Sequence, residues 1–270
     1  MKIKGLIFDV DGTIADTEEI HRQAFNQTFQ EFNLSWYWSV EDYHDLLSIS
    51  GGKERFKKCL NEDIELKNKI ENPGIFIQEL HRRKSENYRS MLASDDIQLR
   101  PGIIRLINEA RDKGIQLGIA TSSSTANLNT LINKTLDLEP EEIFSAIVSG
   151  DIVTDKKPSP VVYQCALAEL GLSADVCIAI EDTSNGNQAA LNSGLCTIIT
   201  THTYTRHDNF DGASLVLDNL GEPDHAFNLT QGYAYGKDLV DIELLDNILT
   251  QKEDIEPFED KMVNAASGIN

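Results

Sequence analysis

The chain has 270 residues, which is enough for one or two domains with a sizeable core. Its net charge of -20 argues against nucleic-acid binding, and no apolar run approaches the ~18 residues that span a membrane. The four cysteines form no CxxC pair and no signal-peptide pattern precedes the first predicted strand, which excludes a disulfide framework and a structural zinc site. We expect a reducing compartment: the cytoplasm, or the plastid stroma if a transit peptide has been removed.

The first predicted strand covers residues 3–9 and leads into the motif DVDGT. Side chains alternate along a strand, so Asp9 and Asp11 start on one side, at the end where open α/β sheets bind ligands. Two such carboxylates can hold a divalent cation, with one attacking a substrate and the other moving a proton. The alternative is an ordinary Asx-type turn through Gly12 and Thr13.

Residues 16–94 interrupt the pattern of strands and read as an all-helical insert. Mostly apolar residues recur at helical spacing near its start, and a second helical face appears near its end. The first set is Ile20, Ala24, Phe25, Thr28, Phe29 and Phe32, and the second is Ile77, Leu80, Lys84, Tyr88 and Leu92. We predict a helical cap domain at 16–94, with a polar return linker at 94–100.

The rest of the chain alternates strands with helices. Strands are predicted at 115–121, 145–149, 176–181 and 195–200, and helices at 102–113, 124–136, 159–170 and 184–193. This order predicts an α/β fold with a doubly wound parallel sheet. The core domain is therefore assigned to 1–15 plus 95–235.

The C-terminal region at 236–270 is predicted as a short helix and an acidic tail. Residues 237–250 have an amphipathic pattern, whereas the acidic and small residues beyond 252 are typical of fraying or disorder. From residue 207 to the end, the chain holds 14 acidic and 3 basic residues. Such an excess indicates a solvated face rather than a binding site.

Hydroxyl groups follow the strand at 115–121. Thr121 ends that strand, and Ser122, Ser123 and Ser124 lead into the next helix. Hydroxyls and N–H groups at a helix N-terminus can bind an anion, although the same residues commonly cap a helix.

A lysine pair, Lys156 and Lys157, precedes the helix at 159–170. A lysine here can hold a phosphate oxygen and stabilise a charged transition state. The alternative is a basic loop before a proline helix start.

Two acids, Glu181 and Asp182, end the strand at 176–181. They can complete an oxygen-rich Mg²⁺ site, or Asp182 can simply cap the next helix. Each of these later motifs is weak alone, but four consecutive elements place polar groups at one end of one sheet. Their conjunction predicts an active site at that end.

Together the four motifs resemble those of the haloacid dehalogenase-like superfamily. DVDGT, the strand that ends in Thr121, the Lys157–Pro158 pair and the Glu181–Asp182 tip carry the likeness, which covers about residues 3–220. The helical insert resembles the C1-type cap of the β-phosphoglucomutase-like branch. The resemblance implies a Rossmann-like core with an inserted C1-type cap.

A closer likeness, to the CbbY-type phosphatases of xylulose 1,5-bisphosphate, lies mainly in the cap. The segments that carry it are HDLL at 44–47, GGKER at 51–55, LHRRK at 80–84, LRPG at 99–102, residues 120–125 with Asn127, and YTRH at 204–207. Ser122 and Ser123 stand where threonines are usual, and Asn187 stands where an apolar residue is usual. These departures leave the chemistry intact.

The resemblance implies roles for the core residues. Asp9 attacks phosphorus and becomes an aspartyl phosphate, and Asp11 protonates the leaving alkoxide before it deprotonates water. The cofactor is Mg²⁺, held by Asp9, the main-chain carbonyl of Asp11 and Asp182, with Glu181 as a further contributor.

The resemblance also assigns groups to the phosphoryl oxygens. Lys157 neutralises these oxygens with the metal, aided by Thr121 and the N–H of Ser122. We further expect Lys157 to hold Asp9 anionic through its proximity.

Residues of the cap are expected to select the substrate. Lys53 and Arg55 would grip a second phosphate, and Glu18 and His21 would face the sugar hydroxyls. The alternative for the helix around His81 is a solvated basic face. The full predicted set is Glu18, His21, Gly51, Gly52, Lys53, Glu54, Arg55, His81, Arg82, Lys84, Thr121, Ser122, Ser123 and Asn127.

We therefore expect an Mg²⁺-dependent phosphatase, a monomer, that converts a small phosphorylated sugar: xylulose 1,5-bisphosphate to xylulose 5-phosphate. A sugar phosphomutase shares every core residue and is the nearest alternative, although GGKER favours hydrolysis. A haloacid dehalogenase would need neither Asp11 nor a metal. A phospho-acceptor regulatory module would need no acid or base at Asp11 and no basic pocket in a cap.

Overall fold

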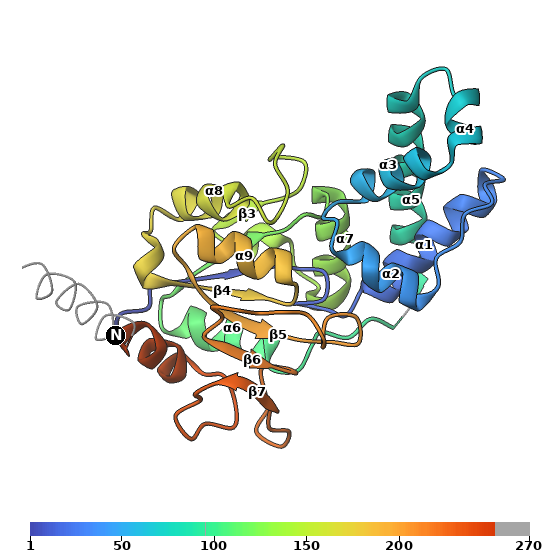
Figure 1. Ribbon diagram of the computed structural model, residues 1–270. Coiled ribbons are helices and arrows are strands. Elements are labelled where there is room, and N and C mark those ends of the chain that lie inside the picture. The colour runs from blue at the N-terminus through green and yellow to red at the C-terminus, as the bar shows by residue number, and fades with distance from the viewer. Residues whose placement is uncertain (95, 252–270) are drawn as a thin grey trace, which may run out of the picture.

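The structure, a computed structural model, describes residues 1–94 and 96–251. A seven-stranded sheet in the order β3-β2-β1-β4-β5-β6-β7 forms its centre (Figure 1). The strands are β1 (Gly5–Phe8), β2 (Gln116–Ala120), β3 (Ala146–Val148), β4 (Cys177–Glu181), β5 (Cys196–Thr200), β6 (Leu215–Leu217) and β7 (Leu229–Gly232). Strands β1 to β6 pair in parallel, so the predicted doubly wound α/β fold is confirmed.

Two strands, β6 and β7, are absent from the prediction. β6 has three residues and β7 has four, and every residue of β7 is exposed. Strands this short lack the alternation that identifies a half-buried strand in a sequence. The unpredicted β7 pairs antiparallel with β6, so the sheet is mostly parallel with one antiparallel edge strand.

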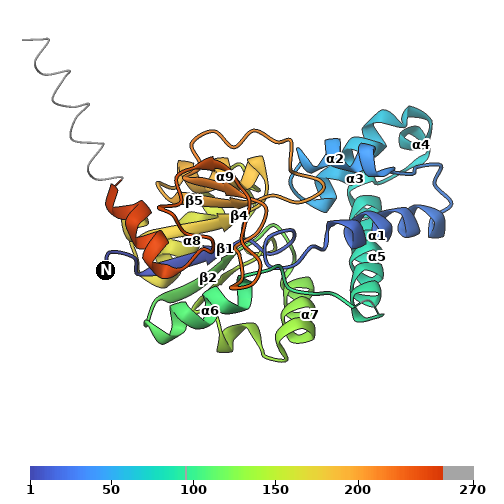
Figure 2. The same ribbon diagram turned by 90° about the horizontal axis from the view of Figure 1, so that it is seen from below.

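Helices cover both faces of the sheet (Figures 1 and 2). They are α6 (Ile103–Asp112) and α7 (Thr125–Leu136) on one face, and α8 (Val161–Leu170) and α9 (Ser184–Asn192) on the other. Leu6 and Phe8 of β1 join the first cluster of buried residues and Ile7 joins the second, as strand alternation requires. None of the helices in the described residues combines the length and apolar character needed to cross a bilayer.

The region predicted as a C-terminal helix packs into the core. Its described helical residues are 242–251, so the helix begins five residues later than 237. Leu244 and Leu245 belong to the same buried cluster as β1, and Asp246 accepts the N–H of Ile3 at 2.9 Å. The predicted acidic tail beyond residue 252 lies outside the described residues.

The predicted helical insert is present and lies beside one end of the sheet (Figures 1 and 2). Its helices are α1 (Glu18–Glu31), α2 (Val40–Leu47), α3 (Gly52–Glu62), α4 (Ile64–Lys69) and α5 (Pro73–Ser94). Aromatic rings fill its interior, where Phe29 meets Trp38 and Phe56 edge to face. Its two connections to the sheet run side by side, because Ala15 and Leu99 form an isolated antiparallel bridge.

Leu245→Ala tests the packing of the C-terminal helix. The change should lower the free energy of unfolding by about 2–5 kcal/mol, because it leaves a cavity in the main core. Urea denaturation measures this loss. The exposed Thr250→Ala on the same helix should change it by no more than about 0.5 kcal/mol, and equal stability of both variants would contradict the packing.

Candidate active site

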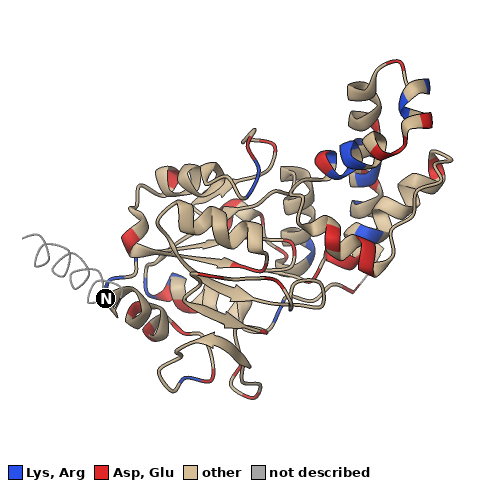
Figure 3. Ribbon diagram, viewed as in Figure 1, with Lys and Arg blue, Asp and Glu red and all other residues tan. Residues whose placement is uncertain are grey.

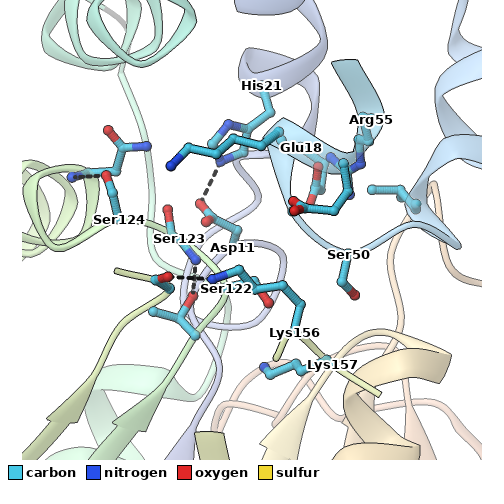
Figure 4. A pocket seen from close by; sticks show the side chains of 18 of the residues that line it. Asp11, Glu18, His21, Ser50, Arg55, Ser122, Ser123, Ser124, Lys156 and Lys157 are labelled. Carbon is cyan, nitrogen blue, oxygen red and sulfur yellow. Dashed lines mark hydrogen bonds and ion pairs between the residues drawn. The ribbon is translucent and has the colours of Figure 1, made fainter. Parts of the chain in front are cut away.

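A cavity of about 130 Å³ lies between the carboxyl ends of the core strands and the cap helices. Figure 4 shows Asp11, Lys157 and three consecutive serines of the core facing Glu18, His21 and Arg55 of the cap. The predicted site residues that line it are Asp9, Asp11, Glu18, His21, Gly51, Gly52, Lys53, Glu54, Arg55, His81, Lys84, Thr121, Ser122, Ser123, Asn127, Lys157 and Asp182. The structure thus brings together most of the residues that the motifs single out.

The loop after β1, which carries Asp9 and Asp11, makes a tight turn at Gly12. Gly12 has φ +85°, and a Cβ at this position would lie 2.3 Å from Oδ2 of Asp182. Only glycine fits both the conformation and this approach. The DVDGT motif therefore needs its glycine so that the carboxylates that follow β1 and β4 can lie close together.

Lys157 joins two buried acids of neighbouring strands. Its Nζ lies 2.5 Å from Oδ1 of Asp9 and 2.5 Å from Oε1 of Glu181. The same oxygen of Glu181 accepts a hydrogen bond from Tyr163 at 2.6 Å, and the other accepts the N–H of Asp182 at 3.1 Å. Lys157 therefore lies against Asp9, and its contact with Glu181 holds it there.

Glu181 lies behind the cavity rather than on its wall. It is fully buried, and a Cβ on Gly186 would lie 2.0 Å from its carboxyl group. Both of its oxygens already accept hydrogen bonds, and a part for Glu181 in binding the metal stays a prediction. Its contact with Lys157 also orients that ammonium.

Three buried carboxylates could hold a cation. One oxygen each from Asp9, Glu181 and Asp182 lies within 4.8 Å of the others. An all-oxygen, anionic donor set fits Mg²⁺, which prefers carboxylate ligands and does not favour sulfur or nitrogen. The carboxylate of Asp182 is oriented by two contacts, with Thr13 Oγ1 at 3.0 Å and His202 Nε2 at 2.9 Å.

Burial dominates the acidity of these carboxyls. Burial raises the pKa of Asp9 more than the Lys157 ammonium lowers it, and Glu181 raises it further. Burial likewise raises the pKa of Asp182 to about 6. The expected effect of Lys157 is present, because its ammonium lowers the pKa of Asp9, but burial outweighs it.

Asp11 differs from its neighbours because its hydrogen-bond partners outweigh burial. Thr17 Oγ1 donates to its Oδ1 at 2.7 Å, and His21 Nε2 lies 3.0 Å from the same oxygen (Figure 4). Although burial opposes the shift, the charge and hydrogen bond of His21 lower the pKa of Asp11 well below its usual range. These contacts favour the deprotonated form of Asp11, and the predicted role as an acid requires that it first gain a proton.

The cap reaches Asp11 through a short chain of contacts. Nζ of Lys84, on α5, lies 2.5 Å from Nδ1 of His21, and the His21 ring stacks on Tyr88 at 4.0 Å. Lys84 is 5% exposed, and burial lowers its pKa to about 7. Of the predicted substrate residues, His21 therefore also contacts Asp11, and Lys84 contacts His21.

The cationic side chains Lys53 and Arg55 of α3 differ in their hydrogen-bond partners. The guanidinium of Arg55 donates to the carbonyls of Leu46 and Ile49 and to Tyr43 at 2.9 Å. Lys53 lines the cavity, and its ammonium has no ion-pair or hydrogen-bond partner within the described residues 1–94 and 96–251. Figure 3 shows the basic residues gathered on this helix.

Arg82 is a correction to the predicted set. It follows His81 on α5, and a helix turns each residue about 100° from the last, so its side chain points away from the cavity. It is 55% exposed and pairs with Glu79 and Glu86 on the surface. For Arg82 the alternative of a solvated basic face is the right one.

The serine segment divides between two uses. Ser124 accepts the N–H of Asn127 at 3.3 Å and caps α7, as the alternative interpretation expects. Thr121 Oγ1 accepts the N–H of Ser123 at 3.1 Å, which shapes the turn at the cavity wall. The segment is therefore a helix cap that also lines the cavity.

Several residues at the site escape the prediction. Lys156 lines the cavity and donates to the carbonyl of Val153 at 2.9 Å. Tyr163 and His202 hold Glu181 and Asp182 from outside the motifs. Only Lys156 carries a signal in the sequence, its place beside Lys157.

Comparison with known proteins agrees with the motifs. A family model described as haloacid dehalogenase-like hydrolase matches residues 6–200. The chain belongs to this family. The resemblance stated from the sequence is thereby confirmed.

The relatives found include CbbY proteins. Protein CbbY of Cereibacter sphaeroides is 42% identical over 220 residues, which cover 82% of this chain and 94% of that protein. Protein CbbY of Rhodobacter capsulatus is 43% identical over 221 residues, covering 82% and 95%. A crystal structure of a Rhodobacter sphaeroides CbbY mutant with xylulose 1,5-bisphosphate has a TM-score of 0.76 at 41% identity, covering 81% of this chain and 96% of that chain. The chain is thus a phosphatase of the haloacid dehalogenase-like hydrolase family.

Lys84→Met tests the contact between the cap and Asp11. Because His21 would lose its partner, and misplacing a catalytic group by about 1 Å can cost about 100-fold, kcat/KM should fall between about 10- and 100-fold. Phosphate release from a phosphate monoester measures the change. Arg82→Met, on the same helix, should retain wild-type activity, and equal losses in the two variants would contradict the arrangement.

Proposed function

We propose that the protein hydrolyses xylulose 1,5-bisphosphate to xylulose 5-phosphate through an aspartyl phosphate on Asp9. The observation that carries this proposal is that one cavity joins Asp9 and Asp11 of the core to Lys53 of the cap. Support for the substrate comes from the likeness to CbbY and its complex with xylulose 1,5-bisphosphate. Two ends of one cavity suit the two phosphates of such a sugar.

Asp9 is the proposed nucleophile. One of its oxygens, Oδ1, contacts Lys157, and the residue lines the cavity. Attack forms a bond between an Asp9 oxygen and phosphorus while the bond from phosphorus to the sugar oxygen breaks. Lys157 would offset charge on the phosphoryl oxygens as well as on Asp9.

Asp11 is the proposed proton carrier. It would give a proton to the leaving sugar oxygen and later take one from the water that cleaves the aspartyl phosphate. The contacts from Thr17 and His21 keep its carboxyl in one place and stabilise its anion. They favour the deprotonated form of Asp11, so the proton for the first step would be taken up from solvent when the substrate is bound.

The residues proposed to hold Mg²⁺ are Asp9, Asp182 and the main-chain carbonyl of Asp11. Bound there, Mg²⁺ would act as a Lewis acid that neutralises the transferring phosphoryl group. Glu181 and Thr13 would orient the groups around it, because each contacts Lys157 or Asp182 directly.

The cap would select the substrate. Lys53 and the N–H groups of Gly51 and Gly52 would bind the second phosphate, with Arg55 shaping the wall through Tyr43. Glu18, whose Oε2 accepts from Tyr43 at 2.8 Å, would face the sugar hydroxyls. This division leaves bond breaking to the core and recognition to the cap.

Asp9→Asn tests the nucleophile. Turnover should fall to background, and no phosphate should remain covalently attached to the protein, because an amide cannot attack phosphorus. Release of inorganic phosphate and acid-quench trapping of labelled substrate measure both. Full activity would end the assignment, and a phosphorylated isomer in place of free phosphate would make the wild-type protein a mutase.

Lys53→Ala tests recognition of the second phosphate. Loss of one charge-assisted contact, worth about 1.5–3 kcal/mol, should lower kcat/KM for xylulose 1,5-bisphosphate by about 10- to 150-fold. Turnover of p-nitrophenyl phosphate, which has a single phosphate, should hardly change. Lys57→Ala on the same helix is the matched control, since its side chain is 58% exposed, and equal losses on both substrates would contradict the proposal.

A further inference from the structure

One contact to Asp182 comes from outside every motif of the sequence. Thr13, in DVDGT, donates to its Oδ1, and His202 lies against its Oδ2 at 2.9 Å. The side chain of His202 is 4% exposed and that of Asp182 is 1% exposed. A contact this well sealed between polar groups has a defined geometry.

The fold brings His202 to this position. Strand β5 is the parallel neighbour of β4, so the loop after β5 lies beside Asp182, which follows β4. Arg100 fixes that loop by donating to the carbonyl of Thr201 at 2.7 Å. The backbone of His202 also closes a turn, because its carbonyl accepts the N–H of Thr205 at 3.0 Å.

A second contact determines which ring nitrogen donates. The N–H of Tyr204 points at Nδ1 of His202, at 3.3 Å. Because Nδ1 accepts there, the ring proton lies on Nε2, which faces Oδ2 of Asp182. His202 is thereby set to donate to the carboxylate.

The backbone of the nucleophile loop closes this contact from the cavity side. A Cβ on Gly12 would lie 2.8 Å from Nε2 of His202 and 2.3 Å from Oδ2 of Asp182. The hydrogen bond is therefore packed under the loop between Asp11 and Thr13. Any rotation of the Asp182 carboxylate would break the contact or strike that loop.

We propose that His202 is a positioning residue for Asp182, which it holds in the orientation needed to bind Mg²⁺. The inference rests on the proposed function through the metal alone and is independent of the substrate. Groups that hydrogen-bond to a metal ligand typically contribute about 10- to 100-fold to metal affinity. The sequence offers no motif for this role, since His202 precedes the YTRH segment.

Two amide variants separate the two contacts of the ring. In His202→Asn, the shorter amide can accept the N–H of Tyr204 but cannot reach Asp182. In His202→Gln, the longer amide can place its NH₂ near the position of Nε2. His207→Asn, at an exposed site in the same loop, is the control.

Calorimetric titration of each metal-free protein with Mg²⁺, without substrate, measures the effect. We expect His202→Asn to bind Mg²⁺ at least about tenfold more weakly, and His202→Gln and His207→Asn to bind within about threefold of wild type. Circular dichroism shows whether each variant is folded. If the Asn variant does not fold, His202→Met takes its place, because its side chain fills a similar volume and cannot donate to Asp182.

Three results overturn the proposal: wild-type affinity in His202→Asn, an equal loss in both amide variants, or a loss in His202→Gln alone. None depends on turnover. A protein with the expected Mg²⁺ pattern that fails to hydrolyse xylulose 1,5-bisphosphate therefore keeps this role of His202 and loses the proposed substrate. A wild-type chain that binds no Mg²⁺ overturns both the metal proposal and this one.

Discussion

Buried carboxylates that meet at one end of the sheet are the constraint on which the site depends. Asp9, Glu181 and Asp182 bring their oxygens within 4.8 Å of one another, where like charges repel and desolvation penalises each anion. Lys157 is the buried cation that joins two of them. Glycines at positions 12 and 186 let the backbone approach the carboxyl groups of Asp182 and Glu181. The same few residues therefore determine both the packing and the charge balance of the site.

The cap is connected to this cluster at two points. Lys84 and His21 reach Asp11 from α5 and α1. On the other side, the loop after β5 carries His202 against Asp182, and Tyr204 enters the aromatic cluster of the cap and donates to Glu19. A displacement of the cap would therefore disturb both the proposed proton carrier Asp11 and the proposed metal ligand Asp182.

Positions along the chain could be predicted, whereas directions of side chains could not. The five predicted core strands appear within two residues of their expected ends, because β-α alternation and the residues at strand ends are local signals. Arg82 was misplaced because only helix rotation against the core decides which face is solvated. Tyr163 and His202 escaped because their partners are 18 and 20 residues away and no motif links them.

The cationic wall of the cap gives a physical reason for the proposed binding of a second phosphate. Burial, with Lys84 and Lys53, lowers the pKa of His81 to about 3, and burial with Arg55 among the nearby charges lowers the pKa of Lys84 to about 7. Positive groups in this wall thus disfavour one another, although the carboxylates of Asp11 and Glu18 raise the pKa of Lys84. A phosphate dianion would raise the pKa of these groups, because it favours the protonated form of every group that faces it. This local attraction can favour a bisphosphate over a monophosphate whose other end is neutral. The net charge of -20 does not prevent this, because exposed acids beyond about 8–10 Å are screened by salt.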